Sequence, residues 1–144
     1  MEFVHAELLD VDSIHNTARG FVRAVQDGTG ATAHLSVENH LRPDGYMVGG
    51  AVQEVTVPVE EFDGRVAFHG ICNLIKALES SSESADALGV WVEDGTAYMD
   101  ASNVVYGREA ALSLGRARGE VSIYERATGR VIYCATGTTE PTYT

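Results

Sequence analysis

The stretch 88–131 constrains the fold of this chain more than any other part of the sequence. Two short apolar runs flank the pair Asp94-Gly95, and Asp-Gly between apolar runs is typical of a tight β-hairpin turn. A helical pattern follows near 107–118 and leads into two more strand-like runs around a second turn. We therefore expect a hairpin, a helix and a second hairpin, against which the upstream residues pack.

The upstream residues predict two further helices. Apolar side chains recur at helical spacing from Ile14 to Val25, and a second apolar stripe runs from Ala67 to Leu78. The first of these helices should stop at Asp27-Gly28, because glycine readily adopts the left-handed conformation that ends a helix.

Two strand-like segments lie between these helices. Residues 31–36 alternate as in a half-buried strand, and residues 46–59 read as a longer strand. The Gly49-Gly50 pair should interrupt the longer one as a bulge or bend, and Pro58 should end its pairing or lie on a sheet edge.

These elements predict one α+β domain over residues 1–144, with a mainly antiparallel sheet of about six strands and about three helices packed on it. Short links between the strands favour antiparallel neighbours. Residues 1–11 could form an arm or an edge strand, and residues 134–144 should be a flexible tail. With 44% apolar residues, a chain of 144 residues can bury a core without disulfides. We expect Cys72 and Cys134 to be reduced packing residues.

The formal net charge of −11 limits the classes of partner. Nonspecific binding to nucleic acid needs an excess of Lys and Arg, so we expect no direct nucleic-acid partner. No apolar run approaches the roughly 18 residues of a membrane span, so we expect no membrane association and a cytoplasmic location. The acidity also fits a decoy whose carboxylates take the place of phosphates in a DNA-binding partner, or solubility alone.

No motif of the sequence points to catalysis, metal or cofactor. The five histidines show no HExxH spacing and no cysteine at metal-ligand distance, and Walker, GxSxG and dinucleotide fingerprints are missing from the sequence. An enzyme using His34 with Glu38 remains an alternative with no motif behind it. We expect a protein that is not an enzyme and that uses no metal or cofactor.

Arginines and aromatic residues concentrate toward the C-terminal end. Nine of the ten basic residues are arginines, and five of the nine follow residue 100. Arg116 and Arg118 end the third predicted helix, where they either match the helix dipole or capture an anion. Strand aromatics are more often core residues, but beside guanidiniums they could also stack on a nucleotide base.

One resemblance covers most of the chain. The segments LGVWVEDGTAYMDASNVV, REAALSLGRARGEVSIYE and TGRVI, with GATAHLS and GYMVGG upstream, resemble small proteins of phages and mobile elements, in particular the first-described Thoeris anti-defence family. The resemblance implies a homo-oligomer, a dimer or larger, with ligand sites at subunit contacts in the host cytoplasm. It implies sequestration, without cleavage, of a cyclic ADP-ribose-like immune signalling nucleotide.

We chose the expected ligand-binding residues by their chemistry, with Arg for pyrophosphate, aromatic rings for the base and Asn for ribose or base edges. They are Arg116, Arg118, Arg108, Asn103, Tyr106, Trp91, Tyr98 and Arg23. The alternative function is an acidic protein that inhibits a defence nuclease or another DNA-binding partner.

Overall fold

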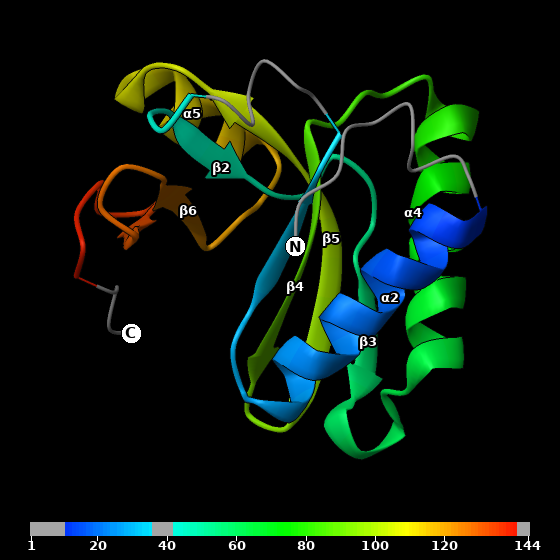
Figure 1. The fold of residues 1–144 in the computed structure, drawn as a ribbon. Helices are drawn as coiled ribbons and strands as arrows, with labels where there is room; N and C mark the ends of the chain where they lie inside the picture. Colours follow the sequence, from blue (N-terminus) through cyan, green and yellow to red (C-terminus); the bar gives the residue numbers. More distant parts are fainter. Residues whose placement is uncertain (1–10, 36–41, 141–144) are drawn as a thin grey trace.

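The computed structural model describes residues 11–35 and 42–140 (Figure 1). The helices are α2 (Val11–Gln26), η1 (Val59–Glu61, a 3₁₀ turn), α4 (Gly64–Ser81) and α5 (Arg108–Ala117). The strands are β1 (Ala31–His34), β2 (Tyr46–Val48), β3 (Val55–Pro58), β4 (Ala87–Glu93), β5 (Thr96–Val105), β6 (Ser122–Glu125) and β7 (Arg130–Tyr133).

The seven strands form one antiparallel sheet in which β5 is the central strand. The order is β1-β4-β5-β2-β6-β7, and β3 also pairs with β5. Together with α2, α4 and α5 this sheet confirms the predicted α+β class. The sheet has one strand more than the expected count of about six, because the predicted strand 46–59 is divided into β2 and β3.

The division of that segment creates a large bulge beside β5. Val48 pairs with Asn103 and Val55 pairs with Met99, so residues 49–54 lie opposite only residues 100–102. The predicted interruption at Gly49-Gly50 is thereby confirmed. Pro58 is the last residue of β3. Among the described residues, this strand pairs with β5 and with no other strand of the sheet, so Pro58 lies on an edge strand, as expected.

The first predicted hairpin is also confirmed. Asp94 and Gly95 join β4 to β5 with φ angles of 49° and 76°. Positive φ at both central residues is the requirement of a type I′ turn, whose twist matches that of the two strands. Trp91 pairs with Tyr98 across this hairpin.

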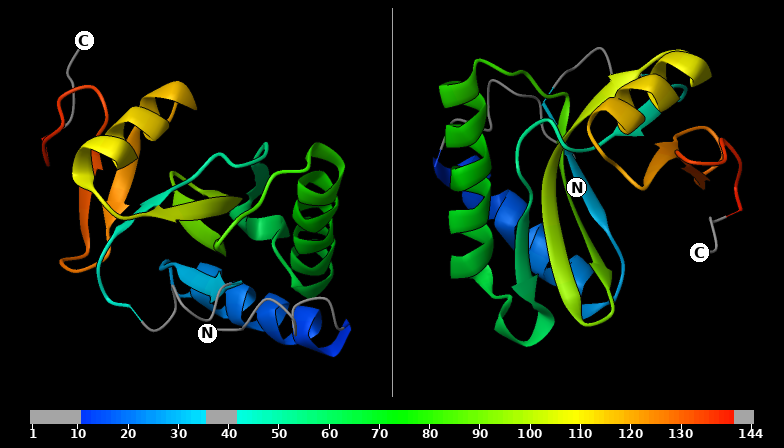
Figure 2. Two further views of the ribbon diagram at one scale, coloured as in Figure 1. Left: turned by 90° about the horizontal axis from the view of Figure 1, so that it is seen from above. Right: turned by 180° about the vertical axis from the view of Figure 1, so that it is seen from behind.

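Two hydrophobic clusters lie along the sheet and are joined by β5. Helices α2 and α4 cover β1, β3, β4 and the first part of β5, with Phe21, Ile71 and Met99 fully buried between them. Helix α5 covers β2, β6 and β7, with Val48 and Ile132 in the second cluster. The view from above shows α5 at the opposite end of β5 from α4 (Figure 2).

Each cluster contains a helical glycine that allows close packing. A Cβ on Gly70 of α4 would overlap the terminal methyl group of Met99 in β5. A Cβ on Gly115 of α5 would lie 2.8 Å from Sγ of Cys134. Cys134 is buried, Cys72 is half-buried, and both are free cysteines. The two helices therefore sit closer to their strands than a larger residue would permit.

The structure describes one residue of the expected N-terminal arm and part of the expected C-terminal tail. Val11 begins α2, whereas the rest of the expected arm at 1–11 lies outside the described residues. The expected flexible tail at 134–144 is described as far as 140, where it folds back in turns: Tyr133 N–H donates to Thr138 O at 2.8 Å, and Gly137 N–H donates to Tyr133 O at 2.7 Å. Within the described ranges, no helix combines the length and the apolar character needed to cross a bilayer.

Candidate functional site

A hollow of about 420 Å³ lies where the chain enters α5 and where β2 meets β6. We call it the α5 hollow. Its size lies within the range of small-molecule pockets. It brings together two of the expected ligand-binding residues, Tyr106 and Arg108. The residues that line it are Asp44, Gly45, Tyr46, Tyr106, Gly107, Arg108, Glu125 and Ala127.

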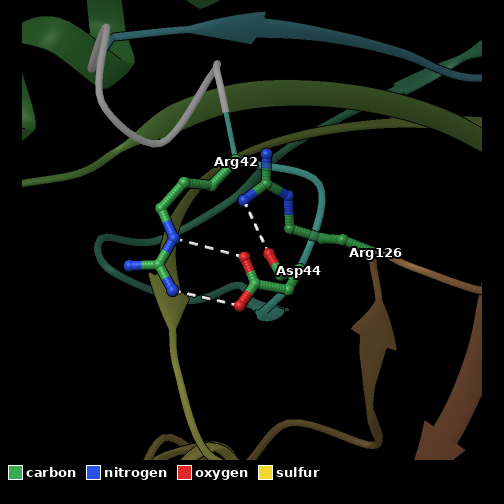
Figure 3. Close-up of polar contacts among 3 residues, drawn as sticks. All are labelled: Arg42, Asp44 and Arg126. Atoms are coloured by element: carbon green, nitrogen blue, oxygen red, sulfur yellow. Dashed lines mark hydrogen bonds and ion pairs between the residues drawn. The ribbon is translucent and has the colours of Figure 1, made fainter.

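Two arginines hold the Asp44 side of the α5 hollow (Figure 3). Arg42 donates to both carboxylate oxygens of Asp44, at 3.2 and 3.0 Å, and its guanidinium lies 3.7 Å from the centre of the Tyr106 ring. Arg126 donates to the backbone oxygen of Asp44 at 2.9 Å. The hydrogen bonds from Arg42, helped by the charge of Arg126, lower the pKa of Asp44.

The opposite side of the α5 hollow is organised by Glu125. Thr128 donates to Oε1 of Glu125, and the Tyr46 hydroxyl donates to Oε2 at 3.3 Å. These hydrogen bonds lower the pKa of Glu125, and the charges of Arg108 and Arg130 act in the same direction. The hollow is thus lined by two carboxylates and by Arg108, and the further guanidiniums of Arg42, Arg126 and Arg130 act on these carboxylates.

The expected residues Arg118 and Asn103 meet elsewhere, at the junction of the two hydrophobic clusters. Arg118 caps the C-terminus of α5 and donates to Oδ1 of Asn103 at 2.7 Å. The second terminal nitrogen of the Arg118 guanidinium donates to the backbone oxygens of Val48 and Gly49, both at 3.1 Å. Asn103 donates to Ser84 O at 3.1 Å. The two side chains therefore tie β2, β5, α5 and the segment after α4 to one another.

A buried carboxyl group lies beside this junction, inside the bulge of residues 49–54. Asp100 is only 8% exposed. Burial, reinforced by the negative charges of Glu120 and Glu54, raises the pKa of Asp100 to about 7, although a hydrogen bond with the backbone of Gly50 and the charge of Arg118 oppose the shift. Burial also raises the pKa of Glu120. Asp100 is thereby held partly protonated near neutral pH.

The expected base-stacking residues Trp91 and Tyr98 stack on each other. Their ring centres are 5.3 Å apart with 12° between the ring planes. Neighbouring Val90 and Met99 point into the core under α2 and α4, so the alternation of the strands directs Trp91 and Tyr98 to the other face of the sheet. Both rings are half-buried, away from the residues that line the α5 hollow.

The last two expected residues lie apart from the others. Arg116 is exposed on α5, and its Nε donates to the backbone oxygen of Cys134 at 2.7 Å. Arg23 is exposed in the last turn of α2. The eight expected residues are consequently distributed over several places, and only Tyr106 and Arg108 line the α5 hollow.

Sequence reasoning missed several residues that shape these places. Asp44, Tyr46 and Glu125 of the α5 hollow and Asp100 and Glu120 of the junction were not proposed. The turn sequence Arg42-Pro43-Asp44-Gly45 was a visible signal, because an Arg two residues from an Asp in a tight turn allows a bidentate pair. Nothing local in the sequence marks Asp100 as buried.

The enzyme alternative pairs His34 with Glu38. His34 is buried at the end of β1, whereas Glu38 lies outside the described residues. Among residues 11–35 and 42–140, no three His, Cys, Asp or Glu side chains come together as metal ligands would.

Comparison of the chain with protein-family models, with curated proteins and with solved structures gave no match.

Proposed function

We propose that this protein binds a small phosphorylated nucleotide in the α5 hollow and sequesters it without cleaving it. The observation that carries the proposal is the combination of the Tyr46 and Tyr106 rings with Arg108 in one hollow. Tyrosine rings offer surface for a base, and guanidinium matches the geometry of a phosphate through paired N–H donors.

Nearby guanidiniums support this site despite the net charge of −11. The guanidiniums of Arg42 and Arg126 contact Asp44, and those of Arg108 and Arg130 act on Glu125. An incoming phosphate can therefore replace the carboxylate of Asp44 as the partner of Arg42, and it also meets Arg108, whose guanidinium is held by a hydrogen bond to Gly137 O. Such preorganisation lowers the entropy lost on binding.

The biological role we propose follows the resemblance stated above. The protein would be a phage-type anti-defence protein that removes a cyclic ADP-ribose-like signal in the host cytoplasm, and it would act as a homo-oligomer. No catalytic group is required, because sequestration needs only binding.

Calorimetric titration with cyclic and linear ADP-ribose and related nucleotides tests the binding step. We expect at least micromolar affinity for one member of the panel and recovery of that ligand intact after denaturation. Arg108→Ala should weaken binding about tenfold or more, because a charge-assisted hydrogen bond contributes about 1.5–3 kcal/mol. The matched control, Lys76→Ala, removes one exposed positive charge from α4 and should leave the affinity unchanged.

Several outcomes would contradict the proposal. They are no heat and no thermal shift with any nucleotide, a cleaved product in place of the intact ligand, or equal effects of Arg108→Ala and Lys76→Ala. Light scattering after size exclusion tests the assembly separately, with a monomer at all concentrations contradicting the homo-oligomer.

A second candidate function is an acidic protein that occupies a DNA-binding partner such as a defence nuclease. It is favoured by a gathering of exposed carboxylates at one end of the molecule. Val59 N–H donates to Gly95 O at 2.9 Å, which brings η1 next to the β4–β5 turn. The exposed acids there are Glu60, Glu61, Glu93 and Asp94. A pull-down from host lysate should then retain a DNA-binding protein that high salt releases, and failure to retain one contradicts this candidate.

A further inference from the structure

A second hollow, of about 380 Å³, lies between α2 and α4 and is distinct from the α5 hollow. We call it the α2–α4 groove. Figure 1 shows α2 passing obliquely in front of the strands towards α4, which lies upright beside them, and core residues pack the two helices together. The residues that line the groove are His15, Ala18, Arg19, Gly64, Arg65, Phe68 and His69.

The groove exists because two of its lining residues are small. Ala18 is almost fully buried at 1% exposure, and a Cβ on Gly64 would meet no atom within 4 Å. Larger side chains stand around these two positions. The hollow is thus formed by residues on two long helices, and such a scaffold holds its shape better than loops do.

Aromatic surface forms one wall of the α2–α4 groove. His15 of α2 stacks on Phe68 of α4, with ring centres 4.3 Å apart and 23° between the planes. His69 meets Phe68 edge-on at 5.9 Å. Three adjoining rings from two helices offer a surface on which a further flat ring can pack.

The charged lining of the groove is entirely basic. Arg19 and Arg65 are exposed at its border, and no carboxylate lines it, although the chain has 21 acidic and 10 basic residues. The carboxylate of Asp63, just before α4, accepts a hydrogen bond from Val66 N–H at 2.9 Å and caps the helix. Asp12 lies one turn before His15 on α2 and is not a lining residue.

We propose that the α2–α4 groove binds a flat aromatic ring that carries a phosphate. The ring packs on the His15–Phe68 pair, and the phosphate accepts hydrogen bonds from Arg19 and Arg65. His69 adds an N–H donor, because an imidazole has at least one in either protonation state. Arg19 also donates to Asn16 within α2, so a bound phosphate would compete with Asn16 for this guanidinium. This inference does not depend on the α5 hollow.

The test is an NMR titration of the full chain with phenyl phosphate, adenosine monophosphate, inorganic phosphate and benzoate. Phenyl phosphate should bind about tenfold more tightly than inorganic phosphate, because its ring stacks on aromatic side chains in addition to the contacts of the phosphate. The resonances that shift should be those of α2 and the start of α4. Comparison of adenosine monophosphate with phenyl phosphate distinguishes a nucleotide from a simple aryl phosphate, and benzoate measures the preference for phosphate.

Variants locate the binding and control for folding. Arg65→Ala and Arg19→Ala should each weaken phenyl phosphate binding about fivefold or more, whereas Lys76→Ala on α4 should not. The far-ultraviolet circular dichroism of each variant reports its fold. No shift with any aromatic anion, equal binding of phenyl phosphate and inorganic phosphate, or loss of binding in Lys76→Ala would overturn the proposal.

Discussion

The carboxylate of Asp100 lies directly against the backbone of Gly49, at a point where no side chain would fit. A Cβ at Gly49 would overlap Oδ2 of Asp100 and would lie 2.7 Å from Oε1 of Glu120. Asp100 of β5 and Glu120, from the link between α5 and β6, thus both lie where a side chain at Gly49 would be. This contact lies where the two hydrophobic clusters of the molecule meet, so its protonation and its packing both affect how the clusters are joined.

The first prediction concerns pH. The pKa of Asp100 rises on folding from 3.8 to about 7, so the folded state binds more protons than the unfolded state between these values. The free energy of unfolding should therefore fall as pH rises from about 4 to about 7, by at most about 4 kcal/mol, and level off above that range. Urea unfolding at pH 5 and at pH 8 measures the difference.

Asp100→Asn should remove much of this pH dependence, because an amide keeps the shape but has no proton to lose. Glu120, whose pKa is also raised by burial, should leave a residual slope. Asp94→Asn is the matched control, since it removes one exposed charge at the hairpin turn and should keep the wild-type slope. Equal slopes in wild type and Asp100→Asn would refute the assignment.

The second prediction concerns the glycine itself. Gly49→Ala should destabilise the protein by about 1–3 kcal/mol, because the added methyl must displace the carboxylates of Asp100 and Glu120. Gly64→Ala is the comparison, because a Cβ at this helical position would meet no atom within 4 Å. This substitution should leave the stability unchanged or raise it slightly. Thermal unfolding reports both variants, and a Gly49→Ala protein as stable as wild type would exclude the close contact.

The third prediction concerns the packing of α4 on β5. Gly70→Ala should cost about 1–3 kcal/mol in a wild-type background, because its Cβ would overlap the end of the Met99 side chain. In a Met99→Val background, which removes the end of that side chain, the same substitution should cost much less. A double-mutant cycle measures this coupling, and additive effects would show that the two residues do not meet.

The sequence alone was sufficient where structure depends on neighbours along the chain. Local preferences of Gly, Asn and Asp for positive φ explain the turn at Asp94-Gly95 and the end of α2 near Asp27-Gly28. The interruption at Gly49-Gly50 follows because glycine weakens the hydrogen bonding between β-strands. The three helices follow from apolar spacing, and the α+β class follows from the order of the elements.

The site was harder to predict because it depends on which distant segments become neighbours. Arg116 and Arg118 are two residues apart, yet one guanidinium reaches the carbonyl of Cys134 and the other reaches Val48, Gly49 and Asn103. Trp91 and Tyr98 carry the right chemistry for a base, but the register of the hairpin pairs them with each other.

What the sequence by itself determined is therefore the set of elements, their order and the fold class, because these arise from local conformational preference and from the period of the apolar residues. Only the tertiary structure decided that Asp100 would be buried beside Glu120, that Arg108 would join Tyr46 at a hollow, and that His15 would stack on Phe68. The physical reason is that each of these contacts joins residues far apart in the chain, and its geometry is set by strand register and helix packing rather than by the residues between them.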